Sequence, residues 1–253
     1  TVGQMTLSGA GTFTINGADM DITTLEMINA QSATGTTTIV MNSLGSATIV
    51  NLGSGTNTYT ASGSTDTVNL ASAAGTDTVQ AHNMDSGQDV ITVTNFQSGS
   101  SASDVISLSD ANLSGTTFGV GVTVDLVDGN AAATGTAGAM TIKEITAATT
   151  LAAGDDILVL VGTTYATEGD VETALEAGGA TPITSGSSFT ANDAIFVVYT
   201  DGTDAYVALA TATTVTAAAF GSGDFVVDNI VKLSGIASIA SGDFANGDFF
   251  MAA

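Results

Sequence analysis

The sequence predicts an all-β protein in which a parallel β-solenoid, or β-roll, precedes a β-rich C-terminal domain with one short helix. Short segments rich in Thr, Val and Ile alternate with breaks rich in Gly, Ser and Asn, a pattern typical of strands separated by turns. A nine-residue spacing recurs between residues 52 and 92, and repeats of this kind build stacked parallel coils. Only the segment after Thr167 has the signals of an amphipathic helix.

The charge balance restricts the partners of this chain. Its 253 residues carry 25 acidic and two basic side chains, a formal charge of −23. No basic patch can form, so we expect neither nucleic acid nor an anionic membrane as a partner. Lys143 and Lys232 are the only basic residues. Solvent or inorganic cations must therefore balance the remaining carboxylates.

The residue types also bear on the context in which the chain works. It has no Cys, so disulfides are excluded. No apolar run approaches about 18 residues, so we expect no membrane insertion. The sequence begins at Thr1 with no basic and apolar leader, so we expect a fragment or a mature form of a longer protein.

The nine-residue pattern has four copies, and each position in it has a physical reason. Position four is Gly or Ser, which lets the backbone turn sharply with φ > 0. Position six is a carboxylate or amide that can meet a hard cation together with turn carbonyls. Position eight is a large apolar residue that points inward from a strand. Position six holds Asn57, Asp66, Asp77 and Asp89, and position eight holds Tyr59, Val68, Val79 and Ile91.

These copies resemble degenerate RTX (repeats-in-toxin) nonapeptides, G-G-x-G-x-D-x-U-x. Residues 23–35 resemble the lead-in of large bacterial surface and S-layer proteins exported by type I secretion, and residues 89–96 and 104–109 resemble the strands that close such a roll. Residues 197–209 and 232–244 resemble the hairpin and the closing segment of the C-terminal regions of these proteins. Most copies lack the double glycine, and Asn57 stands where the family has Asp.

The resemblance implies calcium as the cofactor. The expected ligands are Asn57, Asp66, Asp77 and Asp89, with Asp104 as a looser match. The alternative is that these residues cap turns and accept hydrogen bonds from local amides.

The chain divides near residue 110, where the nine-residue period is lost. Residues 1–110 are predicted to form the solenoid, with lead-in strands at 5–7, 12–15, 22–28, 36–41 and 47–52. Residues 111–253 are predicted to form the C-terminal domain, a candidate secretion or assembly region. Its expected strands are 120–127, 142–145, 156–161 and 225–233.

Three further elements of the C-terminal part have local signals. Thr167 and Asp170 form a capping box before a helix that Gly178 and Gly179 end. Segments 194–199 and 205–209 flank a turn at 201–204 and predict an antiparallel hairpin. Residues 243–253 are either an export signal or a final strand that packs Phe249 and Phe250 into the core, and one segment can serve both roles.

Nothing in the sequence predicts an enzyme. His82 is the only imidazole and lies between two repeats, so no nucleophile–base pair and no zinc site can be assembled with it. HExxH, Walker and dinucleotide-binding patterns are absent. A glycosidase needs only two carboxylates, but the chain has no Trp for stacking on sugars.

We therefore expect an extracellular structural protein of the bacterial cell surface. It is S-layer-like and assembles with itself, assisted by calcium, into a coat, lattice or fibre. Cell-surface polysaccharide is a second candidate partner. The alternatives are the calcium-binding RTX tail of a secreted exoenzyme or toxin, and an adhesin stalk.

Overall fold

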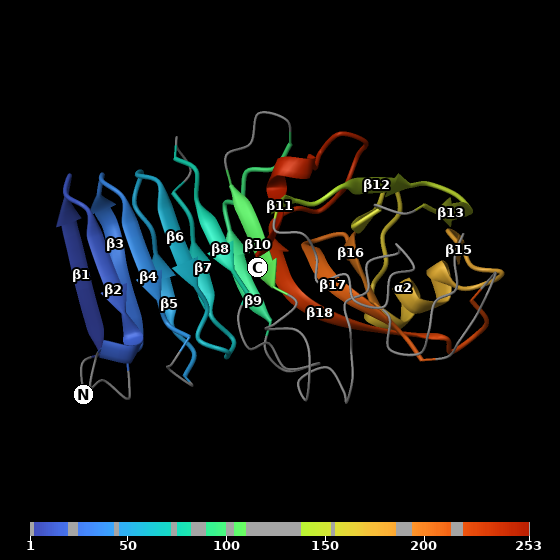
Figure 1. Ribbon diagram of the computed structural model, residues 1–253, viewed down its shortest axis with the longest axis horizontal. Coiled ribbons are helices and arrows are strands. Elements are labelled where there is room, and N and C mark those ends of the chain that lie inside the picture. Colours follow the sequence, from blue (N-terminus) through green and yellow to red (C-terminus); the bar gives the residue numbers. More distant parts are fainter. Residues whose placement is uncertain are drawn as a thin grey trace.

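The protein is mostly β, with parallel pairing between most neighbouring strands and one short helix (Figure 1). The computed structural model describes residues 3–19, 25–42, 46–71, 75–81, 90–99, 104–109, 138–152, 155–185, 194–213 and 220–252. Its strands form a ten-stranded sheet, a seven-stranded sheet and a separate pair. The all-β fold class is confirmed.

Successive strands in the first half of the chain alternate between the two large sheets. The ten-stranded sheet contains β1 (Gln4–Gly9), β3 (Met27–Ala33), β5 (Ile49–Asn51), β7 (Thr67–Asn69) and β9 (Ile91–Thr94). The seven-stranded sheet contains β2 (Phe13–Asn16), β4 (Thr37–Val40), β6 (Asn57–Thr60), β8 (Thr78–Gln80) and β10 (Val105–Ser109). Each strand pairs in parallel with the strand two places along the chain.

The inward side chains of these strands stack in register and form one apolar core. Ile28, Val50, Val68 and Val93 make one column, and Ile39, Tyr59, Val79 and Ile106 make the other. All eight are buried. The predicted inward residues of all four repeats, Tyr59, Val68, Val79 and Ile91, are buried. In the fourth repeat the residue that stacks on Val68 is Val93, two residues beyond Ile91.

The distance between stacked strands varies along the chain. Thr48 and Asp66, at the starts of neighbouring strands, are 18 residues apart, which equals two nonapeptides. The corresponding distances are 20 residues from Asn57 to Asp77 and 27 from Asp77 to Asp104. The structure therefore does not confirm a regular nine-residue period.

The C-terminal half continues both large sheets. β18 (Phe225–Ser234) pairs in parallel with β9, and β19 (Phe249–Ala252) pairs in parallel with β10. The ten-stranded sheet then adds β17 (Ala205–Ala212), β16 (Ala194–Thr200), β14 (Ile157–Leu160) and β12 (Ile142–Ile145), and the other adds β11 (Gly138–Ala139). The separate pair is β13 (Thr149–Leu151) with β15 (Ile183–Ser185), and 3-10 turns occur at Gly17–Asp19 and Asn246–Asp248. The predicted boundary near residue 110 remains a prediction.

The predicted helix and hairpin of the C-terminal part are confirmed. Helix α2 (Glu168–Leu175) begins with both bonds of the predicted capping box, between Thr167 and Asp170, and Gly178 follows its end with φ 89°. β16 and β17 form the antiparallel hairpin, and the Asp201 carboxylate accepts hydrogen bonds from two N–H groups of its turn.

Two glutamates of α2, and Glu176 directly after the helix, cover the part of β18 that extends past β9. Glu168 accepts from the Asn229 N–H, Glu172 from that of Val227, and Glu176 from those of Gly223, Asp224 and Phe225. Four helical residues rise about 6 Å and two strand residues about 6.6 Å, so successive glutamates reach alternate strand residues. The helix thus occupies the place where another strand would pair.

Several predicted strands differ from the structure. The strand predicted at 22–28 is β3, which runs from Met27 to Ala33, and residues 22–24 lie outside the described part of the chain. The strand predicted at 120–127 also lies outside the described residues. Phe249 is buried in the core as predicted, but Phe250 is 40% exposed because alternate side chains of a strand point to opposite faces.

A column of glycines explains position four of the repeats in a way that the sequence did not predict. Gly35, Gly55 and Gly75 precede β4, β6 and β8, and none has a positive φ. A Cβ on Gly55 would fall far inside van der Waals contact with the carbonyl of Gly35, and one on Gly75 would do the same with Gly55. Gly is needed at these positions because the backbones of successive strands come so close.

This column predicts a strong effect of one added methyl group. Gly55→Ala should lower the free energy of unfolding by about 2–3 kcal/mol or more, because backbone atoms cannot move aside as side chains do. Gly11→Ala is the matched control, since its Cβ would meet nothing within 4 Å. Urea unfolding of both variants checks the prediction, and equal midpoints would contradict it.

Candidate functional site

Four polar residues form a buried column at the starts of neighbouring strands in the seven-stranded sheet. Thr37 opens β4 and Asn57 opens β6, while Asp77 and Asp104 come immediately before β8 and β10. The strand register aligns them, and all four are at most 2% exposed. The fold therefore brings together three of the five predicted ligands, Asn57, Asp77 and Asp104.

Hydrogen bonds join Asn57, Asp77 and Asp104 along this polar column. Asp77 Oδ1 accepts from the Asn57 N–H at 3.0 Å, and Asp104 Oδ1 accepts from the Asp77 N–H at 3.2 Å. The other oxygen of Asp104 accepts from the Gln97 N–H at 2.9 Å. Asp77 and Asp104 thus bond across neighbouring strands, and Asp104 also bonds to a backbone N–H seven residues before it, as the turn-capping alternative expects.

The side chain of Asn57 lies among three oxygen atoms, which we call the Asn57 cage. Its Nδ2 is 2.9 Å from Gly53 O, 2.7 Å from Gly55 O and 2.8 Å from Asp77 Oδ1. An amide group has only two hydrogens for these three acceptors. The amide oxygen, Asn57 Oδ1, is buried and has no hydrogen-bond partner. The cage therefore contains more oxygen acceptors than the protein supplies with hydrogens.

Asp66 lies before β7, in the other sheet, and is surrounded by donors. Its carboxylate accepts from the Thr48 N–H, the Tyr59 O–H, and both the N–H and the O–H of Ser62, at 2.8–3.0 Å. Tyr59 is itself fully buried. This carboxylate joins β5, the turn before β7 and the core, which is a structural task.

Asp248 is a buried carboxylate that the sequence analysis did not select. It is 2% exposed, and its Oδ2 accepts from the N–H groups of Gly99 and Ala245, both at 2.8 Å. The charge of Asp104, in the neighbouring polar column, helps to raise the pKa of Asp248. The Asp lies directly before the inward residue Phe249, whereas Asp77 and Asp104 lie two residues before theirs. Because of this one-residue difference, the repeat pattern in the sequence did not identify Asp248.

Burial sets the protonation behaviour of these groups. It raises the pKa of Asp77 from its ordinary 3.8 to about 6, against the hydrogen bonds from Asn57, and the charge of Asp104 adds to the rise. Burial likewise raises the pKa values of Asp66, Asp104 and Asp248, although backbone N–H groups oppose the rise at each. The site therefore favours a bound proton or a nearby cation over free carboxylates.

The protein's two lysines do not serve the polar column. Lys143 pairs with Asp155 at 3.4 Å and Lys232 with Asp204 at 3.1 Å. Asp89, the remaining predicted ligand, and His82 lie outside the described residues. Within the described ranges, no cluster of three or more acidic, histidine or cysteine side chains is placed to hold a metal ion. A cation at the Asn57 cage would depend on carbonyl and amide oxygens beside one carboxylate.

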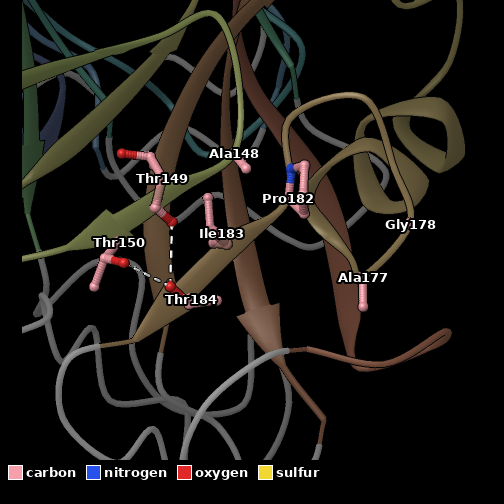
Figure 2. Close-up of a pocket in the computed structure, with 8 residues that line it drawn as sticks. All are labelled: Ala148, Thr149, Thr150, Ala177, Gly178, Pro182, Ile183 and Thr184. Atoms are coloured by element: carbon pink, nitrogen blue, oxygen red, sulfur yellow. Dashed lines mark hydrogen bonds between the residues drawn. The ribbon is translucent and has the colours of Figure 1, made fainter.

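A shallow cavity of about 360 Å³ lies elsewhere, between the β13–β15 pair and the turn after α2 (Figure 2). Its lining is Thr, Ala, Gly, Pro and Ile, without a titratable side chain. The hydroxyls of Thr150 and Thr184 lie 2.9 Å apart and bond to each other. This lining offers neither an acid nor a base for chemistry.

Comparison of the chain with protein-family models, with curated proteins and with solved structures finds no match. In the part of the chain that the structure describes, no helix is long and apolar enough to cross a lipid bilayer.

The raised pKa values predict that acid stabilises this protein. Between the ordinary value of 3.8 and about 6, the folded chain holds a proton on Asp77 that the unfolded chain releases. The free energy of unfolding should therefore rise as pH falls from about 6 toward 3.8. This added stability is lost again as pH rises through the pKa that Asp77 has in the folded chain. Urea unfolding over a pH series measures it. Asp77→Asn should flatten the profile, and an unchanged profile in that variant would refute the assignment.

Proposed function

We propose that this chain is an extracellular structural protein of S-layer type. Its first half would be a β-roll, whose successive coils stack on one another and whose last coil pairs with the C-terminal strands. The observation that carries the proposal is the alternation of in-register parallel strands between two sheets around one apolar core. Stacked coils of this kind form stiff, elongated units because each coil contacts only its neighbours. Such units suit a coat, lattice or fibre.

Calcium at the Asn57 cage is the second part of the proposal. Ca²⁺ binds six to eight oxygens at about 2.3–2.6 Å, and carboxylates, carbonyls and side-chain amides are its usual protein ligands. Gly53 O, Gly55 O and Asp77 would hold it in place of the Asn57 Nδ2 that they now surround, and Asn57 would turn its unpartnered Oδ1 toward the ion as a further oxygen. The ion would neutralise the Asp77 charge and strengthen the contact between β6 and β8. Asp66 is a weaker candidate, since four protein donors already surround its carboxylate.

The charge of the chain gives divalent cations a second role, between molecules. Both lysines are already paired, and copies that each carry −23 repel one another. Close packing therefore requires either cations between the copies or contacts made where the acidic residues are few. Secretion by a type I exporter and attachment to cell-surface polysaccharide are parts of the same proposal.

Calcium should raise the melting temperature more than magnesium does. Magnesium requires a tighter octahedral site, while the Asn57 cage is made of backbone turns and one carboxylate. Asp77→Ala should abolish the calcium-dependent shift and cost about 1–3 kcal/mol of stability, because it leaves the Asn57 N–H unpaired. Asn57→Asp should enlarge the shift. Asp66→Ala is the control, which should lose stability but keep the calcium-dependent shift. A melting temperature of the wild-type chain that does not change with millimolar calcium would refute the site.

Periodic assembly is the direct test of the structural role. The purified chain at high concentration with calcium should form sheets or fibres that electron microscopy detects, and a chelator should disperse them. Light scattering follows the same change in solution. A chain that stays monomeric with calcium would instead favour the tail of a secreted exoenzyme.

A further inference from the structure

The side chain of Asn57 is held on one side only. Its Nδ2 lies among Gly53 O, Gly55 O and Asp77 Oδ1, whereas its Oδ1 is buried without a hydrogen-bond partner. Rotation about the Cβ–Cγ bond exchanges the two arms of an amide and barely changes its shape. The proposed calcium ion requires this rotation, because the cage must present oxygen to the ion. The nitrogen arm then needs a hydrogen-bond acceptor on the side from which Oδ1 came.

Thr37 lies on that side of Asn57. Strand β6 runs between β8, which follows Asp77, and β4, which Thr37 opens, and Thr37 pairs in register with Asn57. Both residues are fully buried. Neighbouring strands lie about 4.8 Å apart, a distance that two inward side chains can bridge. The Asn57 amide can therefore reach Thr37 when its nitrogen arm turns away from Asp77.

The hydroxyl of Thr37 is available for a new hydrogen bond. Thr37 Oγ1 is buried without a hydrogen-bond partner, as is Asn57 Oδ1, and within the described ranges no other side-chain atom of the polar column shares this property. On its far side Thr37 pairs with Phe13, which has no polar side-chain atom. Asn57 is thus the polar neighbour that the register gives to Thr37.

A hydroxyl is suited to both orientations of the amide. It can donate a hydrogen bond to Oδ1 or accept one from Nδ2, because it is both a donor and an acceptor. A valine at position 37 would have nearly the same shape and could do neither. The chemistry of Thr37 therefore allows the amide to turn without leaving a buried N–H unpaired.

We propose that Thr37 is a positioning residue of the calcium site in the Asn57 cage. Without calcium, Asn57 Nδ2 bonds to Asp77 and to the carbonyls of Gly53 and Gly55. When the ion takes that place, Oδ1 turns toward it and Nδ2 donates to Thr37 Oγ1. Thr37 thus controls the affinity of the site without touching the ion. The inference rests on the proposed calcium binding and names the residue that regulates it.

Titration calorimetry of the full chain measures the calcium affinity, counting only the binding that Asp77→Ala removes. Thr37→Val should weaken this binding about tenfold, since the bound form then contains a buried N–H without an acceptor. Without calcium, the variant should unfold in urea at the same concentration as the wild type or slightly above it, because the hydroxyl has no partner there. Poorer packing would instead lower the stability of the calcium-free chain.

Two further variants act as controls for Thr37→Val. Thr37→Ser keeps the hydroxyl and should bind calcium as the wild type does. Thr38→Val makes the same change at the next residue, which points to the opposite face of β4, and should leave both affinity and stability unchanged.

A double-mutant cycle tests whether Thr37 acts through the Asn57 amide. Asn57→Asp replaces the amide by a carboxylate, which has no N–H to place. Adding Thr37→Val to Asn57→Asp should therefore not weaken calcium binding further. An equal loss of affinity with and without Asn57→Asp would overturn the positioning role.

The same titrations separate this inference from the proposed calcium binding. If Thr37→Val binds calcium as tightly as the wild type, the positioning role is overturned and the calcium site stands. If the wild-type chain shows no calcium binding that depends on Asp77, the calcium site is overturned and the role of Thr37 with it.

Discussion

The stacking of parallel strands about 4.8 Å apart is the constraint on which the rest of this structure depends. At that spacing, the turns before the strands must also stack, and they allow no side chain between successive backbones. Gly35, Gly55 and Gly75 satisfy this condition because they have no side chain, and each lies against a carbonyl of the preceding turn in the stack. The polar column meets it by bonding, because each carboxylate accepts an N–H that the neighbouring turn leaves unpaired.

Burying carboxylates in this column has an electrostatic cost that hydrogen bonds only partly offset. Burial raises the pKa values of Asp77, Asp104 and Asp248, and the charge of Asp104 adds to the rise at each of the other two. Toward β4 the column becomes neutral, through Asn57 and Thr37. The Asn57 cage lies where the two kinds of residue meet. A proton on the acids and a cation in the cage would relieve the same excess of negative charge, so each would weaken the other's binding.

The sequence predicted the features that local chemistry determines. The capping box of α2, the hairpin at Asp201 and most strand positions follow from residues within a few places of one another. The pairings of β18 with β9 and of β19 with β10 join distant segments, and no local pattern encodes which segment meets which. The same is true of the glutamate caps, in which each glutamate meets its partner 47 to 61 residues later in the sequence. The repeat pattern identified three residues of the candidate site, Asn57, Asp77 and Asp104. It did not identify Asp248, because this residue reaches the site only through the pairing of β19 with β10.

The position of β19 has a consequence for the way the protein reaches its fold. This strand lies inside the seven-stranded sheet, between β10 and β11, and the neighbouring bond from Gly99 to Asp248 spans 149 residues of sequence. β10 therefore stays an exposed edge during synthesis until residues 249–252 have emerged. Contacts of such long separation form slowly, and unpaired edges invite association in the meantime. This part of the chain would thus remain incompletely folded until its last strand has been made and has entered the sheet.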